Sequence, residues 1–255
     1  MKAIRMTVAL LVFPLIIAAC AGKSEKQQEQ QPSESNVEKV GLLDTTATVD
    51  NEEQDSQGVQ PLTDGGIDEI REVWCDREFN VKPGDKTPGI HEFASSFCKQ
   101  YPGFLANKKM MQYLMDMKGY NEENTGFHIT DRPRNGYLRC SSMSQYDNST
   151  TCCYWKRKNG HRLVAFCMQE DHEADDSGKD LVVFYDYDVE NDLMTPEPSL
   201  TDMVEKLVKK HDAYDTLLPD EGKDIEIDAF DFSEDSAQEY QYLLIWDGQT
   251  FKIQK

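Results

Sequence analysis

The sequence predicts an α+β fold in which N-terminal amphipathic helices precede a mainly antiparallel β-sheet. Apolar residues recur at helical spacing between Ile67 and Lys118. After Gly126 they alternate with a period of two, which is typical of strands. Helices that come first and strands that follow in succession indicate an α+β domain with an antiparallel sheet.

The first 19 residues are typical of a secretory signal peptide. The apolar run from Val8 to Ile17 is shorter than the stretch of about 20 apolar residues that spans a bilayer. It ends in Ile17-Ala18-Ala19-Cys20, which resembles the lipobox of bacterial lipoproteins. The resemblance implies cleavage before Cys20, a diacylglycerol on its sulfur and a fatty acid such as palmitate on its amine. We therefore expect the protein to associate with a membrane through this N-terminal lipid.

The same resemblance implies that the protein is located in the cell envelope. Ala21 is not the aspartate that usually retains lipoproteins in the inner membrane, so the outer membrane is expected, with its periplasmic and surface faces both left open. Residues 20–66 are rich in Gln, Glu, Ser, Asp and Thr and contain no aromatic residue, which predicts a flexible tether. Residues 67–255 are expected to form a single globular domain.

The charge of the chain argues against a nucleic-acid partner. Its 47 acidic and 27 basic residues give a net charge of −20. Such a surface repels phosphate backbones, whereas nucleic-acid binding depends on clustered Lys and Arg. A solvated surface that keeps an exported protein soluble explains the acidity.

The helical segment is expected to hold two or three helices. Phe93, Phe97 and Tyr101 recur at every fourth residue, and Gly119 is a suitable stop. The other apolar residues at helical spacing are Ile67, Ile70, Val73, Trp74, Met110, Met111, Leu114, Met115 and Met117. A methionine-rich face can form an adaptable binding groove, but core packing is its more common role and is expected here.

Five runs rich in β-branched and aromatic residues follow, separated by turn residues. They read GYLRCSSM, TTCCYWKRKNGHRLVAFCMQ, DLVVFYDYD, DIEIDAF and YQYLLIWDGQTFKIQ. One further helix is expected near residues 199–216, between the third run and the fourth. Its apolar face would consist of Leu200, Met203, Val204, Leu207 and Val208.

The pair Asn159-Gly160 in the second run is typical of a two-residue hairpin loop. Such a loop would place Cys152 opposite Cys167. Because neighbouring strand residues point to opposite faces, Cys153 would point away from Cys152. The apolar face of this hairpin is expected to hold Cys153, Trp155, Val164, Phe166 and Met168.

Six cysteines follow Cys20, and an even number in an exported chain indicates up to three disulfides. The expected pairs are Cys152 with Cys167, Cys140 with Cys153, and Cys75 with Cys98. A register slip or a bulge would change the partners, since a hydrogen-bonded strand pair holds its Cβ atoms wider apart than the roughly 3.8 Å that a disulfide prefers. No Cys-x-x-Cys occurs, so neither a zinc ribbon nor a thioredoxin-type site is supported.

No common catalytic motif is present in the sequence. It contains no Gly-x-Ser-x-Gly elbow, no His-Glu-x-x-His and no glycine-rich phosphate loop. The five histidines lack ligand spacing and are expected at the surface or at caps: His91, His128, His161, His172 and His211. We therefore expect no catalytic residue, no cofactor and no metal.

One acidic stretch, DYDVENDLMTPE, partly matches a calcium-loop pattern. Asn191 stands where the sharp turn usually has glycine, Pro196 precedes the last ligand, and a strand rather than a helix comes before the stretch. An acidic hairpin tip is the preferred interpretation. A calcium site would use the oxygens at positions 1, 3, 5, 7 and 12, which are Asp186, Asp188, Glu190, Asp192 and Glu197.

Four segments resemble sequences that recur in secreted and lipid-anchored Bacteroidota proteins with no assigned activity. They read CYWKRKNGHRLVAF, VVFYDYD, LPDEGKDIEI and YLLIWDGQTFKI. The resemblance implies a helix-plus-sheet domain and no particular reaction. Together with the anchor at Cys20, it predicts a lipid-anchored envelope protein that acts as a non-catalytic binding or interaction module for an unidentified protein or small ligand. The alternatives are an envelope hydrolase with an unrecognised site, and an inhibitor or chaperone-like factor for exported proteins.

Overall fold

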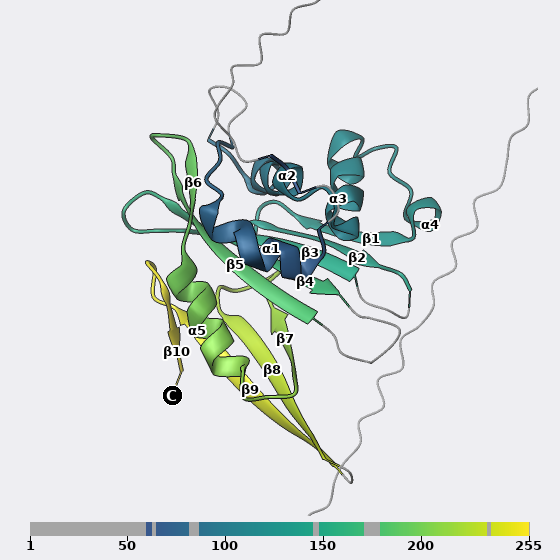
Figure 1. Ribbon diagram of the computed structural model, residues 1–255. Helices are drawn as coiled ribbons and strands as arrows, with labels where there is room; N and C mark the ends of the chain where they lie inside the picture. The colour runs from purple at the N-terminus through teal and green to yellow at the C-terminus, as the bar shows by residue number, and fades with distance from the viewer. Residues whose placement is uncertain are drawn as a thin grey trace, which may run out of the picture. The chain divides into compact units, whose positions relative to one another are not determined.

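Six consecutive strands form the larger of two antiparallel sheets in the computed structural model (Figure 1). The structure describes residues 60–62, 65–81, 87–144, 148–170, 179–233 and 236–254. The predicted signal peptide, Cys20 and most of the predicted tether lie outside these residues. The strands of the larger sheet follow one another in chain order: β1 (Phe127–Arg132), β2 (Tyr137–Ser142), β3 (Asn148–Lys156), β4 (Arg162–Glu170), β5 (Lys179–Asp188) and β6 (Leu193–Pro196).

The last four strands form a second sheet in the order β10-β9-β8-β7. The α+β class and the antiparallel pairing are confirmed, whereas the single sheet that we predicted is wrong. Helix α5 (Pro198–Val208) packs against β5 and carries the chain away from β6, so the next strand begins a new sheet. The strands are β7 (Ala213–Leu217), β8 (Ile225–Ser233), β9 (Ser236–Trp246) and β10 (Phe251–Ile253).

Three helices lie on one face of the larger sheet (Figure 1). They are α1 (Ile67–Val73), which continues into a 3-10 turn over Trp74–Asp76, α2 (Ile90–Gln100) and α3 (Leu105–Met115), and a short α4 (Glu122–Thr125) precedes β1. Within the part of the chain that the structure describes, no helix has the length and apolar character needed to cross a membrane.

The helix predicted near 199–216 is shorter than expected. Its apolar face ends at Val208, and residues 213–217 form β7 instead. Tyr214 and Thr216 are residues with high β-propensity, and their neighbours across the strand pair are Ala229 and Ile227. The strand therefore contributes side chains to the core that a continued helix would not reach.

Ordered packing begins earlier in the chain than the predicted boundary at residue 67. The backbone amide of Leu62 donates to the carbonyl of Gln100 at 3.1 Å, and that of Gly103 donates to the carbonyl of Leu62 at 3.2 Å. Arg77 also donates to the carbonyl of Gln60 at 2.9 Å. The end of the predicted tether is thus hydrogen-bonded to the domain.

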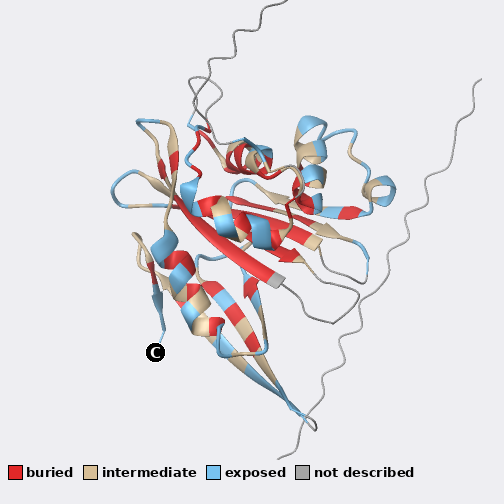
Figure 2. Ribbon diagram, in the orientation of Figure 1, coloured by how far each residue is buried: buried red, intermediate tan, exposed pale blue. Residues whose placement is uncertain are grey.

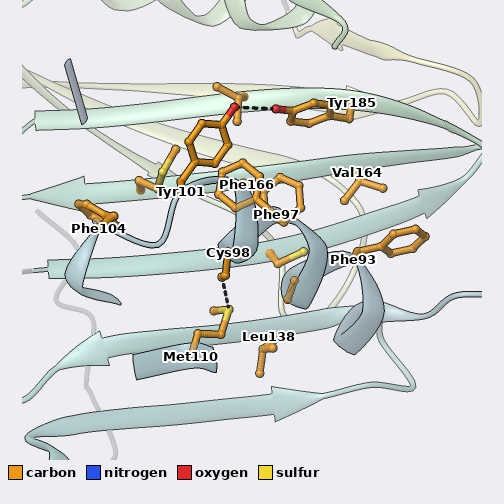
Figure 3. Close-up of a cluster of buried hydrophobic side chains, with 14 of the residues drawn as sticks. Phe93, Phe97, Cys98, Tyr101, Phe104, Met110, Leu138, Val164, Phe166 and Tyr185 are labelled. Atoms are coloured by element: carbon orange, nitrogen blue, oxygen red, sulfur yellow. Dashed lines mark hydrogen bonds between the residues drawn. The ribbon is translucent and has the colours of Figure 1, made fainter. Parts of the chain in front are cut away.

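Two hydrophobic clusters cover the two faces of the larger sheet. The first lies between the sheet and α1–α3, where the rings of Phe97 and Phe166 stack at 3.8 Å and the hydroxyls of Tyr101 and Tyr185 lie 3.2 Å apart (Figure 3). The second lies between the sheet, α5 and the smaller sheet. Figure 2 shows the result: β5 is buried over most of its length, whereas in the first half of β8 buried residues alternate with exposed or half-buried ones.

The β3–β4 hairpin differs from its predicted register by one residue. Gly160 donates its amide to the carbonyl of Arg157 and has φ of +94°, which closes a three-residue loop rather than a two-residue one. Cys152 therefore lies opposite Phe166 instead of Cys167. Because a slip of one residue moves side chains to the other face, the predicted apolar face is divided between both clusters: Cys153 and Trp155 enter the second, and Val164, Phe166 and Met168 enter the first.

The new register overturns the predicted disulfides within the sheet. Cys140 and Cys152 enter the first cluster, whereas Cys153 and Cys167 enter the second, so neither predicted pair lies on one face. The prediction that the two adjacent cysteines face opposite sides is confirmed. The third predicted pair is also unbonded, since Cys75 is exposed and Cys98 is fully buried, and all six cysteines that follow Cys20 are thiols here.

Candidate functional site

A cavity of about 470 Å³ lies between helix α2, the end of α3 and the extended residues before α2. We call it the α2–α3 groove. Helix α2 supplies most of its polar lining, and apolar side chains from the other two segments complete it. The lining residues are Asn80, Val81, His91, Glu92, Ser95, Ser96, Lys99, Gln100, Leu114 and Met117.

The sequence of α2 explains why polar residues line this groove. Phe93 and Phe97 are fully buried against the sheet. His91, Ser95 and Lys99 repeat at the same four-residue spacing but lie on the opposite face of the helix. The packing that fixes α2 on the sheet therefore turns this polar line outward into the groove.

One wall of the groove contains a histidine held by a carboxylate. Nε2 of His91 lies 2.9 Å from Oδ2 and 3.0 Å from Oδ1 of Asp131, on β1. The hydroxyl of Tyr113, on α3, donates to the same carboxylate. Burial, and then this hydrogen bond, raises the pKa of the Tyr113 hydroxyl above its ordinary value, so it remains a donor. The contacts link α2, α3 and β1 at one point.

Other polar groups of the groove already have partners. The hydroxyl of Ser96 donates to the carbonyl of Val81 at 3.3 Å. The carboxylate of Glu92 accepts the backbone amide of Gly89 at 2.9 Å and so caps α2. Lys99 is exposed, and its ammonium makes no ion pair with any described residue.

The four described histidines each contact a carboxylate rather than one another. His128 contacts Glu122, His161 contacts Asp186, and His211 contacts Asp231 at 2.9, 2.6 and 2.9 Å. These three contacts lie in separate regions of the fold, and the His91–Asp131 contact in the groove lies in a fourth region. Among the residues that the structure describes, no group of three metal-ligating side chains comes together. His172 lies outside the described residues.

The five carboxylates of the calcium-loop pattern do not surround a common point. Asp186 and Glu197 both bind the guanidinium of Arg157, so an arginine holds the first and last positions of the pattern. Asp188 accepts the backbone amides of Glu190 and Asn191 and closes the hairpin tip. Asp192 accepts the hydroxyl of Tyr187 at 2.8 Å, and Glu190 is exposed.

Sequence reasoning did not identify the α2–α3 groove. The polar spacing of His91, Ser95 and Lys99 was visible and marks one helical face. Asp131 and Leu114 were not identifiable as its neighbours, because their position depends on how α3 and β1 pack against α2. Polar residues at helical spacing could have indicated the face but not the cavity.

The groove combines a cation, hydroxyls and an apolar wall, which suits the binding of a small polar molecule. Its volume lies in the range of small-molecule sites, but its lining is more polar than is typical of them. Comparisons of the chain with family models, with curated proteins and with solved structures find no match. The geometry of the groove is therefore the basis for any role given to it.

Proposed function

We propose that the protein is a lipid-anchored cell-envelope binding module whose ligand occupies the α2–α3 groove. The resemblance of residues 17–20 to a lipobox supports the anchor. The observation that carries the binding role is the exposed ammonium of Lys99, which forms no ion pair with a described residue, beside a cavity of about 470 Å³. The ligand that fits is a small polar molecule with an acidic group for Lys99 and an apolar part for Leu114 and Met117.

The contacts of the groove favour binding over catalysis. Ser96 donates its hydroxyl proton to a backbone carbonyl, so no base activates it. Among the described residues, the ring of His91 hydrogen-bonds the Asp131 carboxylate alone. Ion pairing between Lys99 and a ligand would be strengthened where the ligand excludes water from the groove.

Equilibrium dialysis of the full chain against a small-molecule extract of the cell envelope tests this role. Mass spectrometry would identify compounds that the parent protein retains. Ser95→Trp places an indole in the groove, whereas Lys108→Trp places one on the exposed side of α3. We expect a compound that the parent and Lys108→Trp retain and Ser95→Trp does not. Equal retention by all three proteins, or no retained compound, would contradict the proposal.

The His91–Asp131 pair supports a second candidate function, an envelope hydrolase. A carboxylate that accepts the proton on Nε2 leaves Nδ1 as the basic nitrogen of the ring, as a general base requires. Hydrolysis of p-nitrophenyl acetate by the full chain would be lost in His91→Gln and kept in His128→Gln, whose histidine contacts Glu122 and does not line the groove. Activity that is absent from the parent, or equal in both variants, would eliminate this candidate.

A further inference from the structure

A second cavity, of about 210 Å³, lies on the face of the larger sheet that meets the smaller sheet. It is bounded by the β1–β2 turn, by the end of β3, by the loop that leads into β8 and by the end of β9. We call it the tryptophan cavity. Its character comes from Arg134, Cys153, Trp155, Lys156, Lys223 and Trp246. Since pockets for drug-sized ligands measure about 300–1,000 Å³, this cavity suits a smaller molecule.

Two indole rings form fixed walls of the tryptophan cavity. The ring centroids of Trp155 and Trp246 lie 6.0 Å apart, and Phe251 packs against them at 5.0 and 5.1 Å. Nε1 of Trp155 donates to the backbone carbonyl of Lys223 at 2.9 Å. The aromatic walls are therefore held by packing and by a hydrogen bond before any ligand enters, which lowers the cost of binding.

Three basic residues line the tryptophan cavity together with these rings. Arg134, Lys156 and Lys223 come from three different segments, and each is exposed. None of them makes an ion pair with a described residue. In a chain with 47 acidic and 27 basic residues, a group of three unpaired cations is a local reversal of charge. A site of this sign attracts anions.

The carboxylate nearest to Lys223 along the chain is that of Asp224, which accepts the backbone amide of Trp246 at 2.8 Å. Asp220 and Glu221 precede Lys223, but both form ion pairs with Arg132, at 3.0 and 3.1 Å. The thiol of Cys153 donates to a backbone carbonyl, and burial raises its pKa to about 12, so it carries no charge at neutral pH. Among the described residues, three basic residues and the one carboxylate of Asp224 leave this site with a net positive charge for a ligand.

We propose that the tryptophan cavity binds a small anion with a planar ring, of the class of aromatic carboxylates. The ring of the ligand packs against the half-buried ring of Trp246, because Trp155 is only 5% exposed, and its carboxylate lies near Arg134, Lys156 and Lys223. Offset stacking of aromatic rings and ion pairing with a cationic rim supply the two parts of the recognition. This site is separate from the α2–α3 groove, and its ligand need not be the same.

Fluorine NMR of 4-fluorobenzoate with the full chain tests the proposal. Lys156→Gln/Lys223→Gln removes two charges at the cavity, and Lys108→Gln/Lys118→Gln removes two from exposed positions in and just after α3. We expect the parent and the second variant to bind the probe equally, and the first variant to bind it about tenfold more weakly, since each exposed pair contributes up to about 1 kcal/mol. The neutral 4-fluorobenzyl alcohol should bind more weakly than the anion.

A third variant tests the aromatic walls. Trp246→Ala removes a half-buried indole and should lose binding. Circular dichroism checks that this variant is folded. Ser95→Trp, which fills the α2–α3 groove, should leave binding of 4-fluorobenzoate unchanged. No binding to the parent, or equal weakening in the two double lysine variants, would overturn the proposal. Undiminished binding in a folded Trp246→Ala would do the same.

Discussion

Arg157 joins side chains that lie far apart in the sequence. Its own side chain is 7% exposed, and its two terminal nitrogens bind Asp186 and Glu197 at 2.5 Å each. Nδ1 of His161 contacts the other oxygen of Asp186 at 2.6 Å. The guanidinium fork suits this role, because a planar cation with several donors can bind two carboxylates at once. The contact fixes the β3–β4 loop to β5 and to the start of α5.

Arg157→Ala is expected to lower the free energy of unfolding by about 3 kcal/mol. Removing one partner of a buried pair costs about 3–5 kcal/mol, and the low end applies because Asp186 and Glu197 keep about a quarter of their side chains exposed. Arg132→Ala is the matched control, since its ion pairs are exposed and are worth about 0–1 kcal/mol. Urea unfolding of both variants measures the difference. Equal losses would contradict this account of Arg157.

Asp247 makes the stability dependent on pH. Its hydrogen bond with Lys252, and then the backbone amides of Thr250 and Gln249, hold the pKa of this carboxyl well below its usual range. An acid with a depressed pKa in the folded state stabilises the fold above its unfolded pKa of about 3.9, and this contribution is lost as the pH falls toward the folded value. Asp247→Asn should therefore be less stable than the parent at pH 7, with a smaller deficit at pH 3. Urea unfolding at pH 7 and pH 3 measures the free energy of unfolding of both proteins. A difference between them that is the same at the two pH values would count against this role of Asp247.

The β3–β4 hairpin shows at the scale of elements what the sequence could predict. Alternation located the strands, and the resulting antiparallel pairing is present. The register was not predictable from Asn159-Gly160, because two-residue and three-residue loops share this turn chemistry and differ by one residue in pairing. Both faces of β4 are apolar, so its hydrophobic pattern could not choose between the two registers.

The same limit applies to the groove and to α5. The polar line on α2 follows from helical spacing, but the cavity depends on the angle at which α3 and β1 meet α2. Helix α5 ends where its apolar spacing ends, at Val208, yet Tyr214 and Thr216 become strand residues because they face the second core. Local pattern therefore determined element type over most of the chain, whereas tertiary contacts determined boundaries and neighbours.

Two glycines test the β1–β2 and β3–β4 turns. Gly160 has φ of +94° with no atom within 4 Å of an added Cβ, so Gly160→Ala should cost about 1–2 kcal/mol from the backbone alone. Gly136 has φ of +70°, and an added Cβ would lie 2.8 Å from the ring of Tyr154. Gly136→Ala should therefore destabilise the protein more than Gly160→Ala. Thermal unfolding of the two variants measures the order, and a reversed order would contradict the described loop geometry.

At the scale of the whole molecule, the described residues contain both hydrophobic clusters and both cavities. The first cluster is completed by α1–α3 and the second by α5 and the smaller sheet. The predicted anchor at Cys20 and most of the predicted tether lie outside the described residues. We expect a lipid at Cys20 to hold the protein at a membrane while the described domain supplies the candidate ligand sites.

Separation of the anchor from the binding domain is the claim on which the proposed function depends most. Detergent-phase partitioning of the parent and of Cys20→Ser, together with urea unfolding of the same samples, tests it directly. We expect the parent in the detergent phase, the variant in the aqueous phase and the same unfolding midpoint for both, because several acyl chains would be lost and no core contact would change. A variant that stays in the detergent phase to the same extent, or one that unfolds at lower urea, would contradict this claim.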